Sequence, residues 1–82
     1  MSPKLKNITA IKFIRALERD GFIFKRQKGS HRIYKHPQRG NWVSVPYHPG
    51  KTFTKGILDG FIDDAGWTED DLIRLKLLQK EK

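Results

Sequence analysis

Residues 22–46 read FIFKRQKGSHRIYKHPQRGNWVSVP, and this stretch decides the fold. It begins with aromatic and β-branched residues, is interrupted at Gly29-Ser30 and at residues 36–40, and ends with the alternating segment NWVSV before a proline. Short runs of this kind, bounded by Gly and Pro, are typical of consecutive β-hairpins. They predict three antiparallel strands at residues 22–28, 31–35 and 41–45.

A helix is predicted before this stretch, at residues 8–20. Three apolar residues recur at three-residue steps and share one helix face: Ile11, Ile14 and Leu17. Thr9 or Asn7 is suited to cap the helix at its N-terminus. Gly21 is suited to the left-handed position that ends it.

Two further helices are predicted after the strands. Residues 53–65 carry an apolar stripe that ends at Gly66. Two glycines of this helix are expected to let it approach the sheet closely: Gly56 and Gly60. Thr68 and Asp71 have the spacing of a capping box, which predicts a third helix over residues 68–80.

The resulting element order is α-β-β-β-α with an extra C-terminal helix. Three antiparallel strands with helices on one face form a two-layer α+β domain. A chain of 82 residues has room for one such domain, covering residues 1–82, with a loose basic leader at residues 1–6. The second face of the sheet and the hairpin tips are left for water or a ligand.

Charge is distributed unevenly along the chain. The formal net charge is +8; residues 1–58 hold 13 Lys and Arg against two acids, and residues 59–82 hold four against seven. A basic body followed by an acidic end indicates a polyanion-binding surface on the first two-thirds. Solubility alone is the competing explanation, but a pI of about 10.1 in so small a domain favours nucleic acid.

Other classes of protein are excluded by what the sequence lacks. It contains no cysteine, which rules out disulfides and thiol chemistry and fits a reducing cytosol. No apolar run has the length of a signal peptide or approaches the roughly 20 residues of a membrane span. We therefore expect a soluble, cytoplasmic protein without a membrane partner.

Cations crowd the first hairpin and the start of the second predicted helix. They are suited to hold phosphates, while Gly29 allows close backbone approach and Ser30 offers a hydroxyl. The candidate nucleic-acid-binding residues are Lys25, Arg26, Lys28, Gly29, Ser30, Arg32, Lys35, Arg39, Lys51 and Lys55. Trp42 and Tyr47 are suited to stack on bases if exposed, and Trp42 in the core or over the sheet edge is the competing interpretation.

The three histidines have neither cysteine neighbours nor a zinc-ligand spacing, so no metal site is predicted. We interpret His36 as a surface residue of a turn, and His48 as a loop residue that orients the loop or touches substrate. His31 is the candidate catalytic residue, because histidine titrates near neutral pH and the surrounding cations suit a phosphate. A hydrogen-bonded structural histidine is the alternative, since strand parity puts His31 on the core side if Ile33 points inward.

The segments GFIFKRQKGSHRIYKHP, VPYHPGKTFTKGIL and AG resemble the HicA toxin family, also described as YcfA-like, over residues 9–66. The marks of this resemblance are Gly21-Phe22, Gly29-Ser30-His31, Pro46-x-His48, Gly56 and Gly66. The resemblance implies a fold similar to the double-stranded-RNA-binding domain and the activity of an mRNA interferase, a ribonuclease that cleaves messenger RNA. It also implies inhibition by a HicB-type antitoxin, and it assigns the family's catalytic histidine to His31. The chain departs from the family's pattern in an acidic second helix and a longer C-terminal helix.

The expected reaction is metal-independent cleavage by the RNA's own 2′-hydroxyl, with no cofactor. His31 takes the proton of that hydroxyl or protonates the 5′ leaving oxygen, and the other transfer falls to water, Ser30 or a lysine. Lys28 and Arg32 are the candidates that offset charge on the phosphate. Two alternatives stay open: a non-catalytic double-stranded-RNA-binding module and, ranked last because no helix-turn-helix signal is present, a DNA-binding protein.

Overall fold

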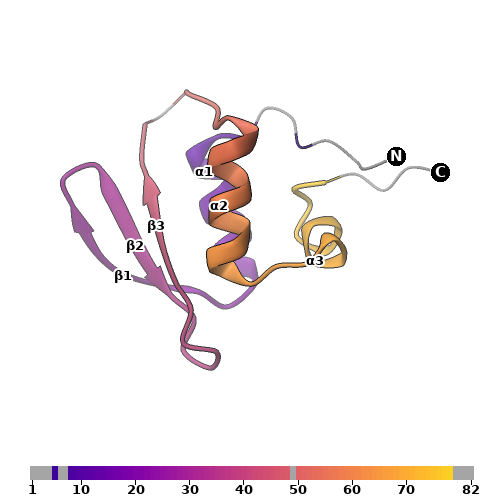
Figure 1. Ribbon diagram of the computed structural model, residues 1–82. Helices are drawn as coiled ribbons and strands as arrows, with labels where there is room; N and C mark the ends of the chain where they lie inside the picture. The colour runs from indigo at the N-terminus through magenta and orange to yellow at the C-terminus, as the bar shows by residue number, and fades with distance from the viewer. Residues whose placement is uncertain (1–4, 6–7, 49, 79–82) are drawn as a thin grey trace.

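The computed structural model describes residues 5, 8–48 and 50–78. The elements of this part are α1 (Ala10–Arg19), β1 (Ile23–Lys28), β2 (His31–Lys35), β3 (Trp42–Pro46), α2 (Lys55–Ala65) and α3 (Glu69–Arg74). The strands form one antiparallel sheet in the order β1-β2-β3, and α1 and α2 pack on one side of it, against β3 (Figure 1). The predicted two-layer α+β class and its α-β-β-β-α order, similar to the double-stranded-RNA-binding domain, are confirmed. The basic leader expected at residues 1–6 lies outside the described residues apart from Leu5.

The hydrophobic core lies between the sheet and the helices, with Phe13 of α1 at its centre. Phe13 is fully buried, and its ring centroid lies 6.5 Å from that of Phe53, 5.3 Å from Phe61 and 5.4 Å from Trp67. Tilted and edge-on aromatic contacts at these distances are favourable beyond the area they bury. The strands add three buried side chains to this core: Tyr34, Val43 and Val45.

Both ends of α1 agree with the prediction, whereas one of its apolar residues does not. The Thr9 hydroxyl accepts a hydrogen bond from the backbone N–H of Lys12, and Gly21 ends the helix at φ +100°. Ile11 is 41% exposed, so the predicted apolar face is wrong at this position. The buried face begins at Ala10, and each residue turns the helix by about 100°, which carries Ile11 away from the core.

The glycines of α2 do not mediate packing on the sheet. Gly56 and Gly60 are exposed, and a Cβ at either position would meet no atom within 4 Å. The expectation of close approach to the sheet is therefore wrong. The ends of this helix are as predicted to within two residues, with Thr54 as N-cap and Gly66 at φ +73° after its last turn.

The third helix is shorter than predicted. The Thr68–Asp71 capping box is present, but α3 ends at Arg74 because Lys76 adopts a left-handed conformation at φ +65°. The backbone N–H of Leu77 then donates to the carbonyl of Leu72, which closes the helix end. Residues 79 and 80 of the predicted helix lie outside the described residues. No helix in the described part of the chain combines the length and apolar character needed to cross a bilayer.

Candidate functional site

Side chains of the sheet alternate between two faces, and the helices cover only one of them. Tyr34 and Val43 are register partners on β2 and β3, and both are buried, which identifies the covered face. The next pair, Lys35 with Trp42, therefore points to the opposite side. We call this side the open face; its residues are Ile23, Arg26, Lys28, His31, Ile33, Lys35, Trp42, Ser44 and Pro46.

His31 lies at one end of the open face, as the first residue of β2. It is exposed, and its register partners are Lys28 on β1 and Pro46 on β3. Gly29 and Ser30 form the turn between Lys28 and His31; Gly29 has φ +59°, and a Cβ there would meet no atom within 4 Å. The imidazole thus lies beside a cation and next to a turn whose backbone a ligand can approach.

Strand parity does put His31 and Ile33 on the same face, as the sequence suggested. That face is the open one, because Ile33 pairs with Arg26 and Ser44 rather than with buried residues. The structural interpretation of His31 assumed that Ile33 points into the core. The fold removes that assumption and leaves the His31 ring accessible.

The chain beyond β3 continues along this end of the sheet. The backbone N–H of Tyr47 donates to the carbonyl of Ser30 at 2.7 Å. This bond holds Tyr47 against the turn that precedes His31, and the exposed His48 follows directly. The backbone at Tyr47 therefore passes beside the turn that precedes the candidate catalytic residue, while the Tyr47 ring packs against the core.

Arg32 lies on the covered face, away from His31. It pairs with the buried Val45, and its guanidinium carbon lies 4.0 Å from the centroid of the Tyr47 ring. Such a cation–π contact fixes the guanidinium against the loop. Of the two cations expected to flank the phosphate, only Lys28 shares a face with His31.

Trp42 and Lys35 occupy the other end of the open face. Trp42 is 52% exposed, and the Lys35 ammonium lies 5.0 Å from its ring centroid. The interpretation that placed Trp42 in the core is therefore wrong, and its ring is available for stacking. Arg26 lies between the two ends, opposite Ile33.

Arg39 belongs to a different cluster, centred on Asp20. The Asp20 carboxylate accepts hydrogen bonds from Arg39 at 2.9 Å, Trp67 at 2.7 Å and Arg74 at 2.8 Å. Burial alone raises the pKa of Asp20, but these three hydrogen bonds outweigh burial and hold the pKa below its ordinary value. Arg39 also donates to the carbonyl of Ala65, so its guanidinium is engaged within the fold.

His36 is buried, and its interpretation as a surface residue is wrong. Its exposed fraction is 4%, and its Nε2 bonds to the backbone carbonyl of Asp20 at 3.0 Å. The backbone N–H groups of Gln38 and Arg39 donate to Nδ1 at 3.3 and 3.2 Å. Since Nδ1 accepts, the ring proton lies on Nε2 and is donated to Asp20. His36 joins the β2–β3 turn to the end of α1.

The remaining predicted cations differ in position. Lys25 is the additional residue at an irregularity of β1, where the register shifts between Phe24 and Arg26. Lys51 is exposed in the loop between β3 and α2. Lys55 begins α2 and forms an ion pair with Asp59 at 2.9 Å.

Three cations of α1 were missed as candidates. Lys12, Arg15 and Arg19 recur at steps of three and four, which is the spacing of one helix face, so the signal was present in the sequence. Among the described residues, no group of three His, Asp or Glu side chains is placed to hold a metal ion.

A family model described as "HicA toxin of bacterial toxin-antitoxin" matches residues 11–67. The matched region extends from α1 through the sheet and α2, and includes the Gly29-Ser30-His31 turn. A search of curated proteins found no match.

Proposed function

Because the chain belongs to the HicA toxin family, it is a toxin of a bacterial toxin–antitoxin system, and we propose that it cleaves messenger RNA in the cytoplasm as an endoribonuclease. The observation that supports this proposal best is the setting of His31. The ring is exposed at the end of the open face, opposite Lys28 and beside the accessible Gly29-Ser30 turn. An imidazole next to a phosphate-binding cation is suited to proton transfer on RNA.

In the proposed reaction, the RNA 2′-oxygen bonds to the adjacent phosphorus, and the bond from phosphorus to the 5′-oxygen breaks. The 2′-hydroxyl loses one proton and the 5′-oxygen gains one, and His31 performs one of these two transfers. The other falls to water, Ser30 or a lysine. The products are a 2′,3′-cyclic phosphate and a 5′-hydroxyl. The nucleophile belongs to the substrate, so the reaction needs neither a metal ion nor a cofactor.

Lys28 is the cation that we assign to the scissile phosphate. It is the register partner of His31, and paired Cα atoms of antiparallel strands are about 4.5–5.5 Å apart. Its ammonium offsets the charge that develops on the phosphate oxygens. Arg26, Lys35 and Trp42 hold the flanking nucleotides along the open face, by charge and by stacking.

The decisive experiment compares wild type with His31→Ala in cells, with Gln38→Ala, at an exposed position outside the proposed site, as the control. Growth and transcript integrity are recorded after induction. We expect wild type and Gln38→Ala to arrest growth and fragment transcripts, and His31→Ala to do neither. General acid–base catalysis contributes roughly 10²–10⁴-fold, so purified His31→Ala loses cleavage by that factor and still binds RNA. Full activity of His31→Ala overturns the assignment.

The chemistry has a separate test on the purified protein. An RNA with a single 2′-deoxynucleotide on the 5′ side of the cleaved bond lacks the nucleophile and stays intact at that bond. Cleavage of the all-ribose RNA continues in EDTA and leaves a 2′,3′-cyclic phosphate. Cleavage of the deoxy-substituted bond, or its loss in EDTA, contradicts the proposed reaction.

The antitoxin that we propose is of the HicB type, with an acidic contact surface that covers the basic hairpin. Charge complementarity to β1 and β2 supports this, since β1 is exposed along its whole length and carries Lys25, Arg26 and Lys28. Titration with such a partner is expected to abolish cleavage at equimolar ratio. A partner that binds without affecting cleavage is inconsistent with inhibition through this surface.

A non-catalytic double-stranded-RNA-binding module remains the second candidate, because the α-β-β-β-α order and the basic charge support it equally. Such a module reads RNA by shape and backbone contacts. It predicts equal RNA binding by wild type and His31→Ala, with no cleavage by either.

A further inference from the structure

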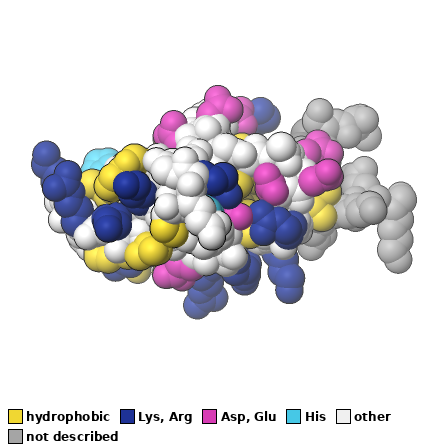
Figure 2. Space-filling model, turned by 90° about the horizontal axis from the view of Figure 1, so that it is seen from below, with side chains coloured by type: hydrophobic (Ala, Val, Ile, Leu, Met, Phe, Trp, Pro, Cys, Tyr) yellow, Lys and Arg dark blue, Asp and Glu magenta, His cyan; other side chains and the backbone are white. Residues whose placement is uncertain are grey.

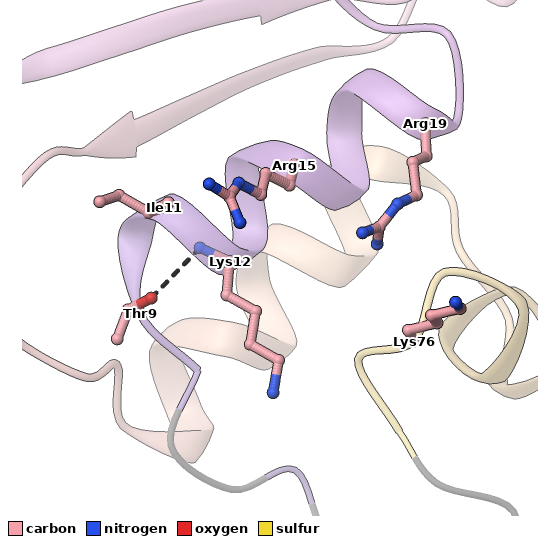
Figure 3. Close-up of a pocket in the computed structure, with 6 residues that line it drawn as sticks. All are labelled: Thr9, Ile11, Lys12, Arg15, Arg19 and Lys76. Carbon is pink, nitrogen blue, oxygen red and sulfur yellow. Dashed lines mark hydrogen bonds between the residues drawn. The ribbon is translucent and has the colours of Figure 1, made fainter.

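A second group of cations lines a groove between α1 and the segment after α3 (Figure 3). Lys12, Arg15 and Arg19 project from α1, and Lys76 lies across the groove from them. The volume is about 350 Å³, and Thr9 and Ile11 complete the lining.

Among the residues that the structure describes, no carboxylate lines this groove. Arg19 donates to the carbonyl of Leu75 at 3.1 Å, which ties α1 to the C-terminal segment. Within residues 5, 8–48 and 50–78, neither Lys12, Arg15 nor Lys76 forms an ion pair; the pairs there join Arg39, Arg74 and Lys55 to aspartates. The positive charge of the groove is therefore not neutralised by the part of the protein that the structure describes.

The groove is connected to the His31 end of the sheet through the start of α1. Thr9 forms an isolated β-bridge with Thr52, and the backbone N–H of Phe53 donates to the carbonyl of Ile8 at 2.9 Å. Thr52 follows Lys51 in the loop whose first residue, Tyr47, bonds to Ser30. A chain leaving His31 can thus follow this loop past Lys51 to the beginning of the groove.

The second helix that packs on the sheet, α2, offers the RNA no comparable basic path. The exposed side of α2 carries Asp59, Asp63 and Asp64, and its one cation, Lys55, is paired with Asp59. Seen from below, acidic side chains are most frequent at the upper edge and toward the right, and basic ones at the hairpin end and along the lower edge, where an acidic side chain also lies (Figure 2). A polyanion bound at His31 is repelled by α2 and attracted by α1.

We propose that the α1 groove binds backbone phosphates of the RNA substrate, several nucleotides away from the bond cleaved at His31. This inference rests on the proposed function. The cations of α1 follow one another at about 4.5 and 6 Å along the helix axis, which suits a ligand with regularly repeated charges. The groove is connected to the His31 end of the sheet, as the binding of one long RNA requires. An acidic protein segment could bind the groove without this connection, so the connection favours RNA.

The test measures RNA affinity in the full chain carrying His31→Ala, so that RNA is not consumed. Oligouridylates of twenty and of four nucleotides are compared for the parent and for Lys12→Gln/Arg15→Gln. The control is Gln38→Glu/Gly60→Glu, which lowers the net charge equally at two exposed positions away from the groove. Because a phosphate contact contributes about 0.7 to the salt slope for single strands, affinity is followed as a function of salt concentration.

We expect the groove variant to bind the 20-mer about tenfold more weakly than the parent, with a salt slope smaller by about 1.4. Its affinity for the 4-mer, and both affinities of the control, stay unchanged. Equal 20-mer affinity, or an equal loss in the control, overturns the inference. Weaker binding of polyglutamate with unchanged 20-mer affinity overturns it in favour of an acidic protein partner. Cleavage of the 20-mer by the chain with His31 intact is measured separately, so failure of the proposed function is distinguishable.

Discussion

Asp20, like the neighbouring Arg19, joins the C-terminal segment to the body of the fold. Its side chain is 6% exposed and receives hydrogen bonds from the β2–β3 turn, from Trp67 and from α3. Three donors on one buried carboxylate compensate for the cost of removing its charge from water. A single side chain thus fixes the relative position of three segments that are distant in sequence.

Replacing Asp20 by Asn is expected to lower the free energy of unfolding at pH 7 by about 2 kcal/mol, because charge-assisted hydrogen bonds are lost. Folding lowers the pKa of Asp20 below its ordinary 3.8, so the unfolded chain takes up the proton first as pH falls. The contribution of Asp20 is therefore complete near neutral pH and is lost as pH falls from about 4 through the lower folded pKa. Urea unfolding between pH 2 and 7 should show a shallower acid decline for Asp20→Asn. Part of the decline remains in the variant, because the pKa of Asp71 is also lowered by folding. Identical pH dependence of the free energy of unfolding in wild type and Asp20→Asn contradicts this account.

The two histidines of the β2 region should separate stability from activity. His36→Ala removes a buried ring that accepts two backbone N–H groups and packs edge-on against Phe22 at 5.1 Å, so we expect a loss of about 2–3 kcal/mol. Cleavage per folded molecule stays at the wild-type level. His31→Ala has the opposite result, with unchanged unfolding and lost cleavage. Urea denaturation and an RNA cleavage assay on both variants check this, and parallel losses in the two variants refute it.

At the scale of elements, the end of α3 contains a local strain. Lys76 has φ +65°, a conformation that costs non-glycine residues roughly 1–2 kcal/mol. Lys76→Gly is therefore expected to raise the free energy of unfolding by up to about 1 kcal/mol, and to weaken RNA binding if the α1 groove acts as proposed. Urea denaturation measures the first effect, and a decrease in stability contradicts it.

Gly66, the residue after α2, is the reverse case, because here a glycine already occupies the left-handed position at the end of a helix. It also has a positive φ, +73°, and a Cβ there would lie 3.0 Å from the Asn41 amide nitrogen, which donates to the carbonyl of Asp64. Gly66→Ala is expected to destabilise the fold by about 1–2 kcal/mol. A neutral result in thermal or urea unfolding shows that this helix end can rearrange.

Local patterns predicted the three strands and the first two helices to within two residues. Turn glycines, caps and apolar periodicity are signals within a few residues, so Thr9, Gly21 and Gly66 could be assigned to helix ends from the sequence. The predictions were wrong where a contact with a residue distant in sequence, or an unusual backbone angle, determines the structure. His36 is buried in contact with Asp20, which is sixteen residues away in the sequence. The early end of α3 depends on the left-handed conformation of Lys76, which is not predictable from the residue type.

The sequence predicted which residues lie at the centre of the candidate site, but not which of the surrounding cations belong to it. His31 and Lys28 are adjacent across a short turn, so their proximity follows from sequence alone. Arg32 directly follows His31 in sequence and Arg39 belongs to the next turn, but Arg32 lies on the covered face and Arg39 is paired with Asp20. Which face a strand residue occupies depends on which neighbours are buried, so the sequence left the face of Ile33 and His31 open, and the register decides it.

At the scale of the whole molecule, the open face and the core share strands but no side chains. A combined Arg26→Gln/Lys35→Gln variant is therefore expected to unfold within about 0.5 kcal/mol of wild type, as is usual for surface substitutions. It should bind RNA more weakly, with a salt slope lower by about 1.4 for single-stranded RNA. Urea denaturation and affinity measured against salt check the two parts. A marked loss of stability shows that these side chains support the fold.

The alternation along β2 and β3 also has a consequence for how such toxins diversify. One set of positions, including Tyr34, Val43 and Val45, is constrained by packing, and the interleaved set is not. Ile33 and Ser44 can therefore change by single substitutions while the protein remains folded. The binding properties of this surface can therefore change without a stabilising mutation elsewhere. A library that varies only these open-face positions is expected to yield folded proteins throughout.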